Sequence, residues 1–150
     1  MTDIHYIKQF EGYSPSIYYC SGNKPTIGYG HVIQPHEKFP TKITEQEAEN
    51  ILKDDLKKYE DAVNKYVKRP LTQLQFTALV FFVYNVGISA FKSSTLLRKL
   101  NDYNNKDYEQ SVVDELRKWI YTKKRINKGL INRREQEITI WKMGSKTLNK

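Results

Sequence analysis

The segment from Thr72 to Gly87 constrains the fold of this chain more than any other. Thr72-Gln73-Leu74-Gln75 has the pattern of a capping box, which places a helix start here. The residues that follow are apolar on nearly every side of a helix: Phe76, Leu79, Val80, Phe81, Phe82, Val83 and Val86. Gly87 is a natural helix stop. A helix that is apolar all round must be covered on all sides, so we expect a buried central helix inside a helical body.

Composition agrees with a single folded domain. The chain has 150 residues, of which 39% are hydrophobic and 28% charged, so it has enough apolar surface to form a core. The longest apolar run, Ala78 to Tyr84, is far shorter than the roughly 18 residues of a membrane span. The N-terminus has no signal-peptide pattern, so we expect no cleaved secretory signal. Cys20 is the single cysteine, which excludes an internal disulfide.

The N-terminal part predicts a short helix followed by a hairpin. Thr2 is a suitable cap for a helix over 3–11 that ends at Gly12. Residues 13–36 mix aromatic and β-branched residues with glycine and proline, which indicates a hairpin with a turn over 21–24. Strand alternation then puts Thr26, Gly28 and Gly30 on one flat face, suited to close approach of a ligand or another backbone.

The rest of the chain reads as helical. Thr44-Glu45-Gln46-Glu47 is a second capping box, and the long amphipathic helix that it opens ends before Pro70. Shorter helices are expected over 94–100, 107–121 and 130–143, with polar connectors over 101–106 and 122–129. The predicted fold class is therefore mostly helical α+β, with one small N-terminal hairpin.

Positive charge is concentrated in the second half. Residues 1–75 hold 10 basic and 10 acidic residues, whereas residues 76–150 hold 15 and 7. Eight of the basic residues fall between Arg117 and Arg134 with no acid among them. This basic segment favours a polyanionic partner, and nucleic acid, anionic lipid and acidic envelope polymers all qualify. A solvated surface that only keeps the protein soluble explains the charge equally well.

One pattern in the hairpin region is specific. Phe10-Glu11-Gly12 is followed at fixed spacing by Cys20 and then by Thr26-Ile27-Gly28-Tyr29-Gly30-His31. Further motifs follow in order: Phe82 to Gly87, Ala90-Phe91, Ser94 to Leu97, Lys99 to Asn101, Trp119, and Gly129 to Arg134 with Glu137. Over nearly its whole length the chain resembles the phage-type lysozymes, also called endolysins, of glycoside hydrolase family 24, in their Glu-Cys-Thr form.

The resemblance implies a fold and an activity. It implies one lysozyme domain over 1–150, with a hairpin lobe over about 12–60, a helical lobe over about 1–11 plus 61–150, and a cleft between them. The implied reaction is hydrolysis of the β-1,4 bond between N-acetylmuramic acid and N-acetylglucosamine in peptidoglycan. Glu11 matches the general acid that protonates the leaving oxygen. Thr26 matches the hydroxyl that positions the attacking water.

Cys20 stands where better-known members of the family have aspartate. A thiol with a reference pKa of about 8.5 is largely neutral at pH 7 unless its surroundings lower that value. Cys20 therefore either orients water and stabilises the sugar cation as a partly ionised thiol, or only fills space. Its spacing from Glu11 and Thr26 favours the first interpretation.

The resemblance also implies residues that bind substrate. Asn85, Ser94 and Thr95 match positions of the helical lobe that face the cleft, and Gly28 and Gly30 line it from the hairpin. Asn85 and Ser94 also have simpler explanations as helix caps. Arg133 matches an arginine that orients the catalytic glutamate. His31 is expected to be a packing or hydrogen-bonding residue, and neither a metal site nor a cofactor is expected.

Three alternative functions remain open from the residues. A lytic transglycosylase acts on the same substrate and needs one glutamate, although Thr26, as a water-holding residue, argues against it. A basic nucleic-acid-binding protein using Trp119 and Tyr121 belongs to a different class, and we expect no specific nucleic-acid partner. A wall-binding module without activity is the third. The expected protein is a monomer that stays in the host cytoplasm until holin-type release and then acts in the periplasm and cell wall, where its partners are peptidoglycan and anionic envelope polymers.

Overall fold

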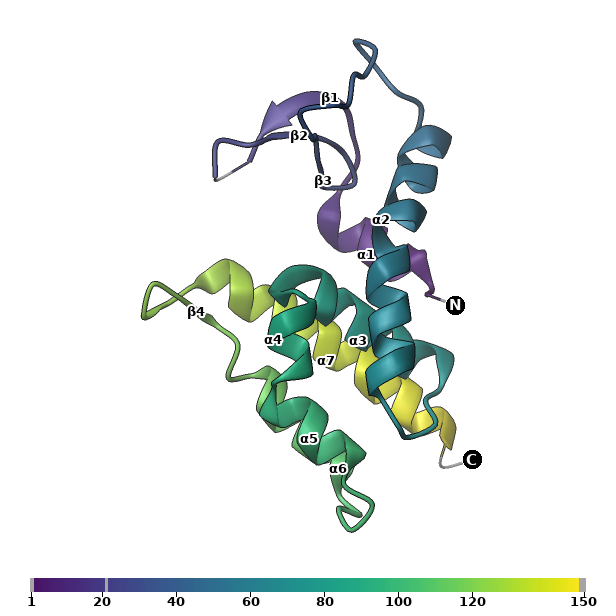
Figure 1. Cartoon of the computed structure of the whole chain (residues 1–150), viewed down its shortest axis with the longest axis vertical. Helices are drawn as coiled ribbons and strands as arrows, with labels where there is room; N and C mark the ends of the chain where they lie inside the picture. The colour runs from purple at the N-terminus through teal and green to yellow at the C-terminus, as the bar shows by residue number, and fades with distance from the viewer. Residues whose placement is uncertain (1, 21, 149–150) are drawn as a thin grey trace. The chain divides into compact units, whose positions relative to one another are not determined.

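A computed structural model describes residues 2–20 and 22–148. Its contacts group the chain into a hairpin unit, residues 4–57, and a helical unit, the described parts of 1–3 and 58–150 (Figure 1). The hairpin unit contains α1 (Ile4–Glu11), β1 (Ser14–Tyr19), β2 (Pro25–Gly28), β3 (His31–Val32) and the start of α2 (Glu45–Tyr66). The helical unit contains the rest of α2, α3 (Gln73–Val86), α4 (Ile88–Lys92), α5 (Thr95–Asn101), α6 (Tyr108–Leu116), β4 (Tyr121–Thr122), β5 (Arg125–Ile126) and α7 (Lys128–Leu148). The expected mostly helical α+β class is confirmed.

The hairpin unit is built on a three-stranded antiparallel sheet in the order β1-β2-β3. In the central strand Thr26 lies opposite Tyr18 of β1 and Val32 of β3. The predicted hairpin is present, although Ser21 of its expected turn lies outside the described residues. The helix α1 belongs to this unit and not to the helical part where the sequence placed residues 1–11, because its side chains contact α2 and the β2–β3 turn.

The flat face expected from strand alternation does not form. Gly28 and Gly30 have positive φ angles of 68° and 81°, so β2 ends at Gly28 and alternation stops there. A Cβ on Gly28 would meet the Cβ of Ala48 at 3.3 Å, whereas a Cβ on Gly30 would meet Glu11. The two glycines therefore allow two different close approaches, one to α2 and one to the end of α1.

The helical unit is organised around α3, as the sequence predicted. Thr72 and Gln75 form both hydrogen bonds of the capping box, and Gly87 ends the helix with a φ of 94°. The residues from Gln75 to Val83 are all buried. Helix α7 packs along α3 (Figure 1), and a Cβ on Gly144 would lie 2.7 Å from the backbone nitrogen of Gln75. A glycine at 144 thus permits this close helix contact.

Several local expectations were wrong. Thr2 does not cap α1, because its hydroxyl hydrogen-bonds the carboxylate of Glu60 at 2.5 Å, and the helix starts at Ile4. The expected connector over 122–129 contains a second hairpin, β4–β5. Its turn residues Lys123 and Lys124 have φ angles of 51° and 67°. Such turns usually show Asn or Gly in the sequence, so two lysines gave no hairpin signal.

Candidate active site

Glu11 is the last residue of α1, and its position is fixed locally. The N–H of Gly12 donates to the carbonyl of Lys8 at 3.0 Å, and the positive φ of Gly12, 72°, turns the chain out of the helix. The Glu11 carboxylate lies against Gly30, since a Cβ added there would be 3.1 Å from Oε2. A Cβ at position 30 would crowd the carboxylate, and the φ of 81° is strained for any residue with a side chain, so both favour a glycine at that site.

Thr26 lies in the central strand with its side chain buried. Its hydroxyl donates to the carbonyl of Lys24 at 3.0 Å. The same hydroxyl is a hydrogen-bond partner of the Cys20 thiol. Because a hydroxyl has one proton and two lone pairs, Thr26 can turn its proton from the carbonyl to the sulfur and still accept from another donor.

Cys20 follows β1 and is half-buried. Its backbone is held by two hydrogen bonds, from its own N–H to the Lys24 carbonyl and from the Asn23 N–H to its carbonyl. The pKa of the thiol is lowered, first by a hydrogen bond from the backbone N–H of Gly22, then by Thr26 and by the backbone of Lys24. All of these donors stabilise the thiolate, so the sulfur has more negative character than a free thiol.

Tyr18 joins this group, and the sequence analysis did not select it. It lies directly opposite Thr26 across the strand pair. Its pKa is raised, first by burial and then by the charges of Glu11 and Cys20, which places the phenol within electrostatic reach of both groups. The sequence does hold a signal for Tyr18: it lies two residues before Cys20, and residues two apart in a strand point to the same face.

His31 is a structural residue in the hairpin unit, as the sequence suggested. Its Nδ1 is 2.7 Å from Asp55 Oδ2 and its Nε2 is 2.9 Å from Glu37 Oε1. The hydrogen bond to Asp55 is the main cause that raises the pKa of His31 to about 9. The imidazolium therefore ties the strand end to α2 and to the following loop. Among the described residues, no group of three or more His, Cys, Asp or Glu side chains is arranged to hold a metal ion.

The remaining predicted site residues lie in the helical unit. Asn85 is exposed near the end of α3, and Thr95 is the first residue of α5. Ser94 is the N-cap of α5, because its hydroxyl accepts from the Leu97 N–H at 3.1 Å and donates to the Phe91 carbonyl at 2.7 Å. Arg133 lies on α7 with its guanidinium carbon 5.0 Å from the centre of the Phe81 ring. The structure thus gathers Glu11, Cys20, Thr26, Gly28 and Gly30 in one unit and Asn85, Ser94, Thr95 and Arg133 in the other.

Arg134 and Glu137 form a buried ion pair that the sequence analysis did not assign a role. Arg134 Nε is 3.0 Å from Glu137 Oε1, and both side chains are almost fully buried. Burial raises the pKa of Glu137 to about 8, although Arg134 and Arg133 act in the opposite direction. The signals for this pair were its i,i+3 spacing on a helix and its place in the last of the family motifs.

Arg134 also fixes the amide of Asn85. Its Nη2 donates to Asn85 Oδ1, and its guanidinium carbon lies 5.0 Å from the centre of the Phe82 ring. With Oδ1 engaged, the amide nitrogen of Asn85 is the group left to donate to a ligand. Asn85 and Arg134 border a pocket of about 330 Å³ in the helical unit, whose other lining residues are Val86, Lys118, Trp119, Tyr121 and Leu130.

The helical α+β fold, with a glutamate ending the first helix and a Thr–Cys pair on the adjoining hairpin, is that of a lysozyme-like protein. The phage lysozyme family matches residues 8–137, so the chain belongs to that family. The chain is 41% identical over 146 residues to an endolysin of Bacillus phage B103, which covers 94% of this chain and 52% of that protein. It therefore spans about half the length of that relative.

Solved structures agree with this assignment. An endolysin from Escherichia coli O157:H7 phage FAHEc1 is 35% identical, with a TM-score of 0.80 over 92% of this chain and 89% of that chain. The muramidase domain of SpmX from Asticaccaulis excentricus is 31% identical, with a TM-score of 0.75 over 92% of both chains. In the described part of the chain, no helix combines the length and the apolar character of a membrane span.

Proposed function

We propose that this chain is a muramidase of the endolysin type, which hydrolyses the β-1,4 bond between N-acetylmuramic acid and N-acetylglucosamine in peptidoglycan. The observation that carries the proposal is the grouping in the hairpin unit. The Glu11 carboxylate rests on Gly30, and Thr26 and Cys20 share a hydrogen bond on the adjoining strand. A carboxyl group and a water-binding hydroxyl are the two groups that glycoside hydrolysis requires.

In the proposed mechanism Glu11 protonates the glycosidic oxygen as the bond breaks. Thr26 donates its proton to the Cys20 sulfur, so its lone pairs accept a hydrogen from the attacking water and point the oxygen of that water toward the anomeric carbon. The partly ionised Cys20 sulfur adds negative charge near the cationic sugar and takes up, through Thr26, the proton that the water loses as it bonds to the anomeric carbon. Arg133 is the proposed orienting residue for Glu11. This is a Glu-Cys-Thr version of family 24 chemistry. Because its pKa is lowered, the Cys20 thiol partly supplies the negative charge that a carboxylate would give at that position.

The same proposal assigns substrate contacts. The amide nitrogen of Asn85 and the hydroxyl of Thr95 suit the N-acetyl and hydroxyl groups of the sugars. Gly30 keeps a side chain away from the Glu11 carboxylate, whereas the proposed part of Gly28 is through its backbone, because a side chain there would point at Ala48 of α2. The Ser94 hydroxyl donates its proton to the Phe91 carbonyl, so we propose that its oxygen accepts a hydrogen bond from a sugar hydroxyl or amide. The working protein is proposed to be a monomer, released from the host cytoplasm by a holin-type route to act on the wall.

Product analysis tests this function against its closest alternative. Purified peptidoglycan is digested, and the released muropeptides are identified by mass spectrometry. A muramidase gives reducing N-acetylmuramic acid ends. A lytic transglycosylase gives 1,6-anhydro ends, and a wall-binding module releases nothing. Either of the last two results contradicts the proposal.

A further inference from the structure

The β4–β5 hairpin is a solvent-exposed ribbon with two distinct chemical features. All six of its residues, from Tyr121 to Ile126, are exposed. Tyr121 and Ile126 are directly opposite each other in the register, so their side chains share one face of the ribbon. They are 57% and 62% exposed, so both side chains are accessible to a partner on that face.

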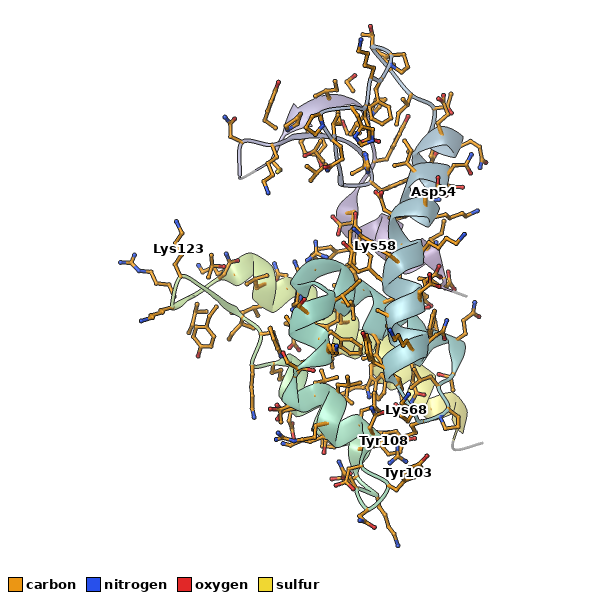
Figure 2. All side chains as sticks on the ribbon, viewed as in Figure 1. Asp54, Lys58, Lys68, Tyr103, Tyr108 and Lys123 are labelled. Carbon is orange, nitrogen blue, oxygen red and sulfur yellow. The ribbon has the colours of Figure 1, made fainter. Side chains whose placement is uncertain are left out.

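The turn of this hairpin places cations beside that apolar pair. Lys123, Lys124 and Arg125 follow one another at the tip, and Figure 2 shows Lys123 there, pointing away from the helices of its unit. Within the described part of the chain none of the three has an ion-pair partner. Other cations of the basic segment are neutralised, since Arg117 pairs with Glu135 at 3.2 Å and Lys118 with Glu115 at 2.7 Å.

The turn lysines adopt a backbone conformation that costs energy. Both have positive φ angles, 51° and 67°, where glycine and asparagine are favoured and a longer side chain is strained. Strain of this kind is retained where the side chains have a use in that place. The hairpin is also preformed, because the N–H of Asn127 donates to the Ile120 carbonyl at 2.8 Å and its side chain to Thr122 at 3.2 Å.

From this arrangement we propose that the β4–β5 hairpin is a docking surface for an anionic lipid bilayer. Its cations meet the phosphate headgroups, while Tyr121 and Ile126 rest at the boundary between headgroups and acyl chains. The charge selects an anionic surface. The apolar pair selects a bilayer over a soluble polyanion, because a polymer in water offers no acyl region for an isoleucine side chain.

Vesicle co-sedimentation tests this inference with the whole chain at low salt. Vesicles of phosphatidylglycerol with phosphatidylcholine are compared with phosphatidylcholine alone, and soluble polyphosphate serves as the polymer probe. Each basic side chain near an anionic leaflet strengthens partition roughly fivefold, so Lys123→Gln/Lys124→Gln should bind anionic vesicles about 25-fold more weakly. Tyr121→Ser/Ile126→Ser should lose roughly tenfold.

Two matched variants serve as controls in the same unit. Lys106→Gln/Lys142→Gln removes the same charge from exposed positions, and Tyr103→Ser removes an exposed aromatic side chain elsewhere (Figure 2). Both should bind vesicles like the parent. A Tyr121→Ser/Ile126→Ser variant that binds equally well, or a parent that binds polyphosphate but not vesicles, would overturn the proposal.

A turn-optimised variant separates binding from folding. Lys123→Asn/Lys124→Gly places residues suited to positive φ at the tip, so its thermal midpoint should rise while vesicle binding falls as in the glutamine pair. Retained vesicle binding by this more stable variant would refute the role of the two cations. Vesicle binding is measured without peptidoglycan, so its outcome is independent of the proposed muramidase activity.

Discussion

The hairpin unit and the helical unit are stabilised in different ways. The helical unit buries a nearly continuous apolar helix, with Leu79 to Val83 almost fully excluded from solvent. The hairpin unit has a smaller set of buried residues, such as Ile7, Ile27 and Leu52. It adds polar contacts, among them the Lys8–Glu49 ion pair. The unit that holds Glu11, Cys20 and Thr26 is therefore the one whose shape depends most on charge and on glycine conformation.

The buried pair Arg134–Glu137 is the main exception to an apolar helical unit, and removing one partner should have the largest effect on stability. Above about pH 8, where Glu137 is ionised, Arg134→Met leaves its carboxylate buried without its cation, and we expect a loss of about 3–5 kcal/mol in the free energy of unfolding. Urea denaturation measures this loss. The double variant Arg134→Met/Glu137→Leu should recover most of it. If the double variant is as unstable as the single one, the charge imbalance is not the cause.

His31 should make the stability of the hairpin unit depend on pH. Its pKa is raised from 6.5 to about 9, so its interactions with Asp55 and Glu37 contribute fully below about pH 6.5 and are lost as pH rises through about 9. The contribution is on the order of 3 kcal/mol. His31→Asn should therefore destabilise the protein strongly at pH 6 and little at pH 10 in urea denaturation.

The exposed His36 provides the control for that experiment. His36→Asn should change the free energy of unfolding little at either pH, because the His36 side chain is exposed and its charge is screened by solvent. An equal destabilisation by His31→Asn at pH 6 and pH 10 would show that His31 contributes packing only.

Cys20 should affect activity and leave the fold intact, because it is half-buried at the end of a strand. Cys20→Ala removes the sulfur that accepts from Thr26, and we expect roughly a 100-fold loss of lytic rate. Cys20→Asp restores negative charge and should stay within about tenfold of the parent. Clearing of cells stripped of their outer membrane measures both rates. Full activity of folded Cys20→Ala would reduce the residue to a space-filling role.

The basic segment should have the smallest effect on lytic activity, and only when the substrate is a whole wall. Salt shortens the reach of its charges to about 8 Å at 0.15 M, so lysis should weaken with salt while cleavage of a short neutral chitooligosaccharide, if accepted as substrate, weakens less. Lys123→Gln/Lys124→Gln/Lys128→Gln should slow wall lysis a few-fold at low salt. Unchanged lysis by this triple variant would show that these three charges do not serve recognition of the wall.

Local patterns predicted much of the framework. The capping boxes at Thr44 and Thr72 form as expected, and Gly12 and Gly87 end their helices. These features depend on a few neighbouring residues, which is why the sequence reveals them. The family resemblance implied that Glu11 and Gly30 lie at one site, and the Glu11 carboxylate does lie against Gly30.

Features that depend on distant contacts or unusual backbone were missed. Strand alternation predicts that Gly28 and Gly30 lie on one face of a strand, because nothing in the sequence shows that both have positive φ. Arg133 and Arg134 are adjacent arginines with the same appearance, and only packing decides that Arg134 is the buried one. The β4–β5 hairpin was not predicted, because its turn lacks the asparagine and glycine residues that such turns prefer.

The rate of muropeptide release by Glu11→Gln tests the central claim most directly. The substitution keeps the shape of the side chain against Gly30 and removes the transferable proton. We predict a fall of about 1,000-fold or more in release from purified peptidoglycan, with circular dichroism and thermal midpoint unchanged. A folded Glu11→Gln protein that releases muropeptides at nearly the parent rate would contradict the account and remove Glu11 from the site.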